Sequence, residues 1–420
     1  MSQFTRFLAA SGLANLADGI ATLIWVWVAS LLTRDAALIA LVPVALRLPW
    51  VIFAIPAGLV ADRVDRHRMV LAMDALRAAA FAVAAVALMV WAPSATAPAT
   101  GVSSWPLFLT LCLAALVVGV AEVFRDNAAQ TLLPALVPDQ ALERANGQLW
   151  SLESVTNQML GPALGALLLG AALALPFAVN AAAYAAAALI LLAMKGQFRP
   201  APGDQPAHWR RDLAEAFRYL LAQPLLLMLA CITGLWNLLD SMMMFALLLH
   251  AQENLQMSAS TYGLVLSAMA IGGIIAGLTG DRVVARIGPG ATCGSMLFLS
   301  AFAVMAMPML AHPVALGACF ALMHLGGIYW NIVSVSTRQR LIPDMLRGRV
   351  NSLYRLLAWG AIPLGSLLAG VIIEQSSPWL GRADALVLPL WVAGVALVIV
   401  SIVVQRPLRR LLSEVTGWRR

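Results

Sequence analysis

Two aspartates lie in the middle of long apolar stretches, where a carboxylate needs either a partner or a function. Asp18 is about ten residues, or roughly 15 Å, into a stretch that begins near Phe7, and Asp240 lies inside a similar stretch. An unpaired charge at the centre of a membrane costs at least about 2.5 kcal/mol. Because a carboxylate held there can bind and release a proton, both aspartates are candidates for coupling a proton gradient to another process.

Arg47 gives Asp18 an alternative, structural role. Arg47 lies at a comparable depth in the next apolar stretch, so the two side chains could form a static ion pair. No arginine stands at the corresponding position in the stretch that follows Asp240. Asp240 is therefore the stronger candidate for a proton carrier.

Other polar residues in apolar stretches share helix faces. Asn15 and Asn237 each precede one of the two aspartates by three residues, which places each pair on one side of a helix. Glu153 and Asn157 are four residues apart, and Glu153 could attract a cationic substrate or form a salt bridge at the membrane interface. His324 is either a hydrogen-bonded packing residue or a proton relay. The proton-coupling candidates are Asp18, Asp240, Glu153 and His324, and the candidates for a substrate cleft are Asn15, Arg47, Asn157, Trp236, Asn237 and Asn331.

The composition shows which elements must carry these residues. The 420 residues are 61% hydrophobic and 11% charged, whereas a typical globular domain is about 25% charged, so a soluble fold is excluded. The first apolar stretch is too long for the hydrophobic region of a cleaved signal peptide. We predict an all-α polytopic membrane protein with twelve spans, at residues 8–32, 36–60, 69–92, 106–126, 146–170, 174–194, 225–249, 261–280, 290–311, 314–337, 351–373 and 385–404.

The basic residues predict the orientation. All but three of the 27 Lys and Arg lie at the ends of the chain, in the loops that follow even-numbered spans, or near the span ends that border these loops; the exceptions are Arg34, Arg47 and Arg382. The positive-inside rule then places both termini in the cytoplasm. We expect an integral protein of the plasma membrane, which is the inner membrane in bacteria. The net charge of +7 is thus spread over cytoplasmic segments, which argues against a nucleic-acid partner.

The chain repeats itself, with an offset of about 220 residues. Residues 12–18 match residues 234–240, residues 58–64 match residues 277–283, and a third, gapped match includes Gly165 and Gly365. Two halves with the same orientation are related by an axis along the membrane normal, and a substrate route between them is typical of transporters. We predict a six-helix half at residues 1–195, a cytoplasmic linker with an amphipathic helix at 196–223, a second six-helix half at 224–405 and a basic cytoplasmic tail at 406–420.

Over essentially its whole length the chain resembles the major facilitator superfamily. The segment after the second span is similar to the signature Gly-x-x-x-Asp-Arg-x-Gly-Arg-Arg, although Asp65 stands where the pattern has glycine. The fifth span resembles the antiporter signature of the superfamily, with departures at Asn157 and Ala166. The segments 134–165 and 338–370 are similar to the branch that contains macrolide-efflux and enterobactin-export proteins. The residues that carry the resemblance are Gly58, Asp62, Arg63 and Arg66 in the first copy, Gly277, Asp281 and Arg282 in the second, and Gly161, Pro162 and Gly165 in the fifth span.

The resemblance implies the major facilitator fold, with two pseudo-symmetric halves, and a cytoplasmic gate. Asp62 and Arg66 are expected to form a latch between the halves; the alternative is that they are ordinary loop charges that fix the topology. Five more charged residues are expected at the same level, where they either complete the gate or extend to the interface. They are Asp74, Arg77, Glu122, Arg125 and Asp126.

The chain shows no phosphate-binding loop, metal-ligand cluster or partnered nucleophile, so we expect neither an enzyme nor a cofactor. We predict a monomeric, proton-coupled multidrug efflux antiporter that works by alternating access and exports bulky amphipathic compounds. A dedicated metabolite or siderophore exporter is the first alternative. A protein that handles or flips lipids on the same scaffold is the second.

Overall fold

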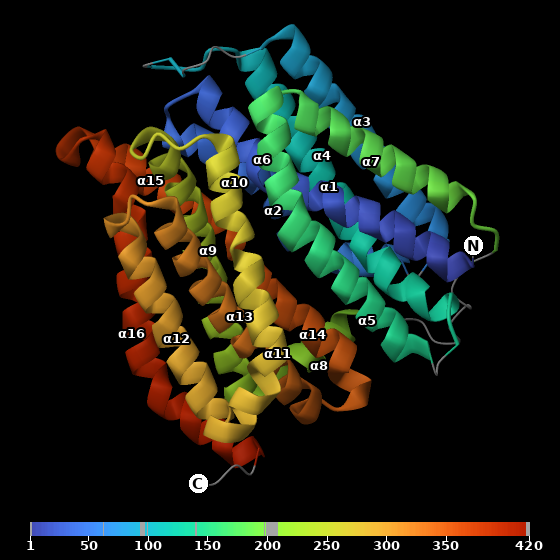
Figure 1. Cartoon of the computed structure of the whole chain (residues 1–420). Helices are drawn as coiled ribbons and strands as arrows, with labels where there is room; N and C mark the ends of the chain where they lie inside the picture. The colour runs from blue at the N-terminus through green and yellow to red at the C-terminus, as the bar shows by residue number, and fades with distance from the viewer. Residues whose placement is uncertain are drawn as a thin grey trace. The chain divides into compact units, whose positions relative to one another are not determined.

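The computed structural model of the chain is built almost entirely of helices (Figure 1). It describes residues 2–61, 63–92, 97–98, 100–138, 141–196, 198 and 209–416. In this part of the chain the β-structure is limited to an isolated bridge between Thr33 and Val102. The prediction of an all-α membrane fold is confirmed.

Eleven helical stretches among the described residues are long and apolar enough to cross a membrane. The predicted fifth span accounts for the twelfth, because it is divided among α5 (Leu142–Glu153), a seven-residue π-helix η3 (Ser154–Leu160) and α6 (Gly161–Ala171). Neither α-helical part is long enough alone to cross about 30 Å of hydrocarbon. The structure is therefore consistent with the twelve predicted spans.

The chain forms two compact units. Unit 1 contains Met1–Pro202 and Ala251–Ser267, and unit 2 contains Gly203–His250 and Ala268–Arg420. Residues 251–267 thus pack with unit 1, although the sequence places them in the second half. Besides α5, η3 and α6, unit 1 holds α1 (Gln3–Leu32), α2 (Ala36–Ala61), α3 (Arg66–Val90), α4 (Trp105–Leu132), η1 (Leu133–Ala135), α7 (Leu175–Leu192) and α10 (Ala259–Ser267).

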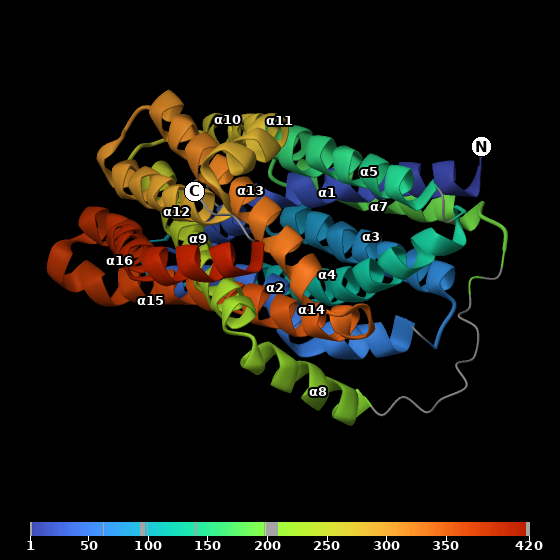
Figure 2. The same ribbon diagram turned by 90° about the horizontal axis from the view of Figure 1, so that it is seen from below.

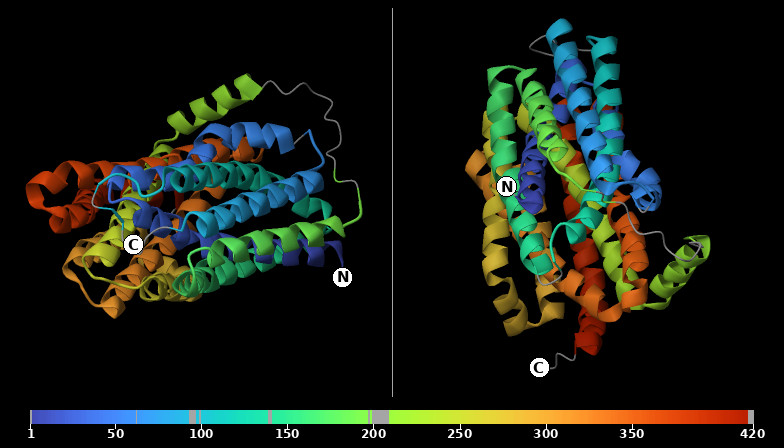
Figure 3. Two further views of the ribbon diagram at one scale, coloured as in Figure 1. Left: turned by 90° about the horizontal axis from the view of Figure 1, so that it is seen from above. Right: turned by 90° about the vertical axis from the view of Figure 1, so that its right-hand side faces the viewer.

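Within unit 1, α1 packs along α7 and α6, while α3 packs on α4 and α7 (Figures 1 and 3). The helices α1 and α7 are antiparallel, since the Arg6 guanidinium near the start of α1 donates to the Ala193 carbonyl just after α7, at 2.6 Å. Trp25 near the other end of α1 contacts Phe177, near the start of α7, with ring centroids 5.1 Å apart. This register brings Asp18 and Tyr184 to the same height.

Unit 2 has the same kind of helix packing. The pairs α12 with α16, α11 with α13 and α15 with α16 lie side by side, and α8 packs on α14 through the buried side chains Ala216, Leu220, Val350 and Leu353 (Figure 2). Unit 2 comprises α8 (Trp209–Ala222), most of α9 (Pro224–Glu253), α11 (Met269–Ile287), α12 (Pro289–Ala306), η4 (Met307–Met309), α13 (Pro313–Leu341), α14 (Asp344–Trp359), α15 (Ile362–Leu380) and α16 (Arg382–Thr416).

Two segments are more helical than the sequence suggests. The residues expected to form a basic tail after 405 continue α16 as far as Thr416, because Leu408 and Leu412 are buried in the core of unit 2. The second copy of the loop signature, which includes Asp281 and Arg282, lies inside α11 instead of after a span.

Candidate functional site

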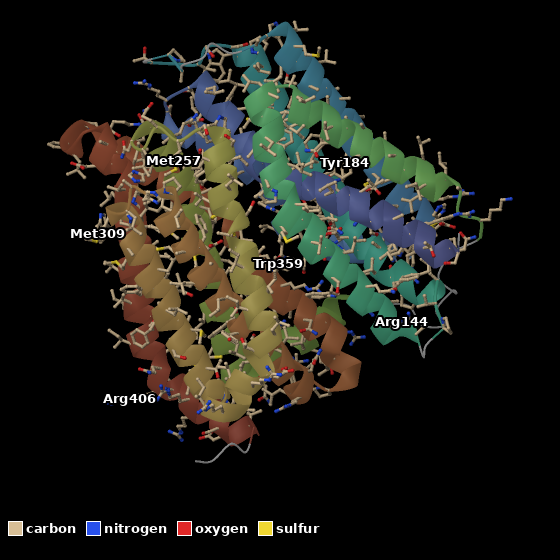
Figure 4. All side chains as sticks on the ribbon, viewed as in Figure 1. Arg144, Tyr184, Met257, Met309, Trp359 and Arg406 are labelled. Atoms are coloured by element: carbon tan, nitrogen blue, oxygen red, sulfur yellow. The ribbon has the colours of Figure 1, made fainter. Side chains whose placement is uncertain are left out.

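Asp18 lies in an ion-pair and hydrogen-bond network inside unit 1. Its Oδ1 accepts from Arg77 Nη2 and, at 2.5 Å, from the hydroxyl of Tyr184. Tyr184, on α7, is labelled in Figure 4. Arg77 Nη2 also donates to the Tyr184 hydroxyl oxygen at 2.6 Å. Arg77 is fully buried, whereas the Asp18 side chain is 25% exposed. Three helices, α1, α3 and α7, therefore hold one carboxylate that can still be reached from outside the bundle.

The network continues along α3 and α4 in the direction of the N-terminus of α3. The fully buried Asp74 lies 3.6 Å from Arg77 Nη1 and 3.3 Å from Arg125 Nε. Arg125 Nη1 in turn donates to Asp126 Oδ1 at 3.3 Å. These four residues belong to the same network as the proton-coupling candidate Asp18. Their predicted part in a cytoplasmic gate remains a prediction.

The ion pair between Asp18 and Arg47, the alternative role considered for Asp18, is not formed. Arg47 on α2 donates to Glu122 Oε1 on α4 at 3.0 Å, and Asp18 is bound by Arg77. The reason is helix packing, because α2 packs closely on α4, whereas α3 lies against α7, the neighbour of α1. Arg47 thus neutralises Glu122 and leaves Asp18 to Arg77.

The charges of this network do not balance. Its ion pairs join three carboxylates, those of Asp18, Asp74 and Asp126, to two guanidinium groups, those of Arg77 and Arg125, which leaves one negative charge in excess. The neighbouring pair of Arg47 and Glu122 is balanced by itself. An excess charge among largely buried groups is costly unless it is neutralised by a proton or a cation. The arrangement can therefore hold one exchangeable positive charge.

A close crossing of helices lies directly beside Asp18. A Cβ on Gly19 would overlap the backbone of Asn157 and Gly161, and a Cβ on Gly165 would overlap the Ile20 carbonyl. Asn157 is inside the π-helix η3, which begins just after the exposed Glu153. The glycines of the antiporter-like signature, with Pro162 between them, thus serve to bring this helix against α1 at the level of Asp18, as small residues do in membrane interfaces.

The contacts of Asp65, in the signature loop between α2 and α3, explain why an aspartate stands where the signature has glycine. The Asp65 carboxylate caps α3 by accepting from the Arg68 amide at 3.0 Å, and it also accepts from the Phe198 amide at 3.2 Å. Burial raises the pKa of Asp65, but these two hydrogen bonds and the nearby charges of His67 and Arg68 outweigh burial, and the pKa is lowered. A glycine at this position could not provide the cap.

Of the two residues of the predicted latch, the structure describes only Arg66. Asp62 lies outside the described residues, and Arg63 is exposed. The guanidinium of Arg66 donates to the Thr131 carbonyl at the end of α4, at 2.9 Å, within unit 1. Gly58 faces the Asn127 side chain of α4. The latch remains a prediction.

Asp240 of unit 2 stands in a different setting from Asp18. No hydrogen bond or ion pair joins its carboxylate to another described residue, although it lies in the middle of α9. The next residue, Ser241, donates to the Ile362 carbonyl at 2.8 Å, and Asn237 donates to the Ala358 carbonyl at 2.8 Å. The two repeat-related aspartates are thus unequal: one lies within an ion-pair network, and the other has no polar partner in the part of the chain that the structure describes.

Other candidates of unit 2 are spread over several helices. Trp236 faces Gly327 of α13, and His324 lies beside Gly273 of α11. Asn331 is exposed. Gly277, Asp281 and Arg282 lie along α11, and a Cβ on Gly277 would contact nothing within 4 Å. The structure does not bring these residues together as it does the charged residues of unit 1.

Two tyrosines were missed by the sequence analysis. Tyr184 bonds both Asp18 and Arg77. In unit 2, the Tyr354 hydroxyl lies 2.8 Å from Thr233 Oγ1 and 3.0 Å from Ser334 Oγ, and its ring stacks on the Arg338 guanidinium at 3.9 Å. A signal existed, because only five tyrosines occur in the chain and Tyr184 interrupts an alanine-rich run.

The repeated apolar helices and the charged network within them define a membrane transporter of the major facilitator type. The chain belongs to the transmembrane secretion effector family, whose model matches residues 1–413. It is similar to the enterobactin exporter EntS of Escherichia coli O1:K1, with 27% identity over 319 residues, which cover 71% of this chain and 74% of that protein. The EntS protein of Shigella boydii serotype 18 shows the same identity and coverage.

Solved structures show the same fold at low sequence identity. A bacterial homologue of the human lysosomal transporter Spinster, in an inward-facing and unoccupied conformation, has a TM-score of 0.72 at 14% identity and covers 98% of this chain and 97% of its own. A bacterial homologue of the iron transporter ferroportin, in an inward-facing state, has a TM-score of 0.69 at 17% identity and covers 95% and 98%. The prediction of the major facilitator fold is confirmed.

Proposed function

We propose that this transporter is a secondary active exporter that exchanges protons for bulky amphipathic compounds, across the bacterial inner membrane and with both termini in the cytoplasm. The observation that carries the proposal is the Asp18 network. Asp18 is partly exposed, is bound by the fully buried Arg77, and belongs to a set of ion pairs with one excess negative charge. Such a site holds a proton or a cationic group and disfavours an anion.

The geometry suggests how protonation of Asp18 would act on the helices. Arg77 reaches Asp18 with Nη2 and Asp74 with Nη1. When Asp18 is neutral, the attraction between Asp18 and Arg77 falls, and Asp74 remains as the ion-pair partner of the guanidinium. The contact between α1 and α3 would weaken, and a change of this kind can bias a two-state equilibrium of the transporter.

The relatives favour a second candidate, an exporter dedicated to a siderophore. Exporters that are similar in sequence carry enterobactin in their name. This reading differs from the first in the range of substrates, while the role of Asp18 is the same in both.

Inverted membrane vesicles with an acidified lumen would test the proposal. A pH-sensitive dye reports protons that leave the lumen as lipophilic cations, macrolides, siderophores or labelled lipids are added. We expect proton release with wild type and with Asp384→Asn, an exposed control, and none with Asp18→Asn. Release by siderophores alone would select the second candidate. Uptake of a compound without proton release, or unchanged release by Asp18→Asn, would refute proton exchange at Asp18.

A further inference from the structure

A buried asparagine one helical turn from the Asp18 network lacks a hydrogen-bond partner among the described residues. Asn180 of α7 is fully buried, and neither Oδ1 nor Nδ2 bonds another described residue. Trp25 of α1 is also buried, and its Nε1 is likewise unpaired within the described chain. Buried polar atoms in native proteins are almost always paired, with protein or with ordered water, and the need is greatest inside a membrane.

The antiparallel register of α1 and α7 places these two groups together. Asp18 meets Tyr184 at one height, and Trp25 meets Phe177 two turns further along α1. Asn180 follows Phe177 by three residues and precedes Tyr184 by four, so it lies on the same face of α7 and between the two heights. Its amide therefore stands between the Asp18 network and the Trp25 indole.

Aromatic rings close off the space around Asn180. Phe81 of α3 lies 5.2 Å from the Trp25 ring, 6.1 Å from the Phe177 ring and 5.6 Å from the Tyr184 ring. Each of these aromatic side chains is almost completely buried. The unpaired polar atoms thus lie at the level of these apolar rings, and Arg77 adds two more nitrogens, Nε and Nη1, that donate no hydrogen bond to a described residue.

We propose that Asn180 and the Trp25 indole hold internal water, and that this water carries protons between Tyr184 and the end of unit 1 that is opposite the N-terminus. The inference rests on the proposed function for its role in proton supply, but the hydration site does not depend on it. An ordered buried water requires two to four polar partners, and the Asn180 amide, with a donor and an acceptor, supplies two of them between the level of the indole N–H and that of the Tyr184 hydroxyl.

The proton balance of the relay is simple. The Tyr184 hydroxyl already donates to Asp18 Oδ1 and accepts from Arg77 Nη2. A second lone pair on the same oxygen is free to accept from water. When Tyr184 gives its proton to Asp18, it takes one from this water, which is replenished by the next water, and the tyrosine stays neutral. Under the predicted orientation, Asn180 lies on the outer side of Asp18.

Radiolytic hydroxyl labelling in H₂¹⁸O would test the hydration site in the full-length protein in proteoliposomes. Oxidation of a buried side chain by this method reports water held beside it. We expect ¹⁸O on Trp25 or Phe177 in wild type, and a fall to the level of Phe108, a buried control on α4, in Asn180→Leu. An unlabelled Trp25 and Phe177 in wild type, or equal labelling in Asn180→Leu, would overturn the site.

The same proteoliposomes separate the site from its role. Substrate-driven proton release should be at least about tenfold slower in Asn180→Leu, partly restored in Asn180→Ser, and unchanged in the exposed control Asn146→Leu. Labelling that depends on Asn180, together with equal proton release in all variants, would overturn the relay and leave the hydration site. Labelling that depends on Asn180 without any proton release by wild type would refute the proposed function alone.

Discussion

The ion pair between Asp18 and Arg77 should have a measurable coupling energy. Removing one member of a buried pair costs about 3–5 kcal/mol because the other charge is left behind. For Arg77→Met we expect about 3 kcal/mol, since Asp18 is partly exposed and Asp74 keeps Arg125 at 3.3 Å. For Asp18→Asn we expect about 1.5 kcal/mol, because Arg77 keeps Asp74 and Tyr184. The double variant should cost less than the sum by about 1–2 kcal/mol.

The assay is unfolding of the purified protein by denaturing detergent in mixed micelles, followed by tryptophan fluorescence. The four proteins of the cycle yield the coupling energy of Asp18 and Arg77 directly. The exposed pair Arg410 and Glu414, 2.9 Å apart on α16, provides a matched control with an expected coupling below about 0.5 kcal/mol. If the Asp18 and Arg77 cycle shows no more coupling than this control, the pair is not an energetic link between α1 and α3, and the switching role of Asp18 fails with it.

Two further predictions concern stability in detergent. Gly19→Ala should destabilise unit 1 by about 1–3 kcal/mol, because the added methyl overlaps the backbone of Asn157 and Gly161. The control Gly147→Ala, with open space around the added methyl, should not lower the melting temperature. Equal melting temperatures of wild type and Gly19→Ala would contradict the close helix crossing. Asp65→Ala should cost about 1 kcal/mol at neutral pH through loss of the cap. Because the folded-state pKa of Asp65 is lowered, its contribution to stability is complete above the unfolded-state pKa near 3.8 and is lost as the pH falls through the folded-state pKa. The melting temperatures of Asp65→Ala and wild type should therefore converge in acid. A difference between the two melting temperatures that widens in acid would refute this account.

Much of the architecture could be predicted from the sequence because it rests on patterns of long range. Span length and apolar composition depend only on the thickness of the bilayer, and the duplication makes each half support the other. Gly165 and Gly365 show this, since the sequence pairs them and the structure places each against a helix backbone, at Ile20 of α1 and Leu238 of α9. A glycine with this role leaves a trace in both repeats.

The partner of Asp18 could not be predicted in the same way. The predicted third span starts at residue 69 and treats Arg77 as a residue near the interface, but α3 starts at Arg66, so Arg77 lies about 16 Å from the start of its helix. When Arg77 is placed near the interface, as the sequence suggests, depth alone favours Arg47 as the partner of Asp18. The choice between the two arginines depends on which helices are neighbours, and hydropathy contains no information on that.

The polar groups of α7 show a similar limit. Tyr184 and Asn180 lie four residues apart in a run rich in alanine, a spacing that places both on one helix face. The sequence does not reveal whether that face meets lipid or α1. The π-helix η3 is also beyond a pattern-based prediction, because its seven residues include no glycine or proline that would mark the change of helix type.

The position of α10 in unit 1 has a consequence for the order in which the protein is built at the ribosome. A Cβ on Gly263 of α10 would overlap the Ala166 side chain of α6, so the two helices meet through small residues and with little room between them. Chains emerge from the N-terminus, and domains generally fold as they are completed. Unit 1 cannot be complete when its seven preceding helices have emerged, because residues 259–267 are made only after α8 and α9 of the other unit. The surface of α6 around Ala166 therefore has no α10 to pack against while those two helices are synthesised. During this interval a chaperone can bind that surface, or another apolar segment can pack on it incorrectly.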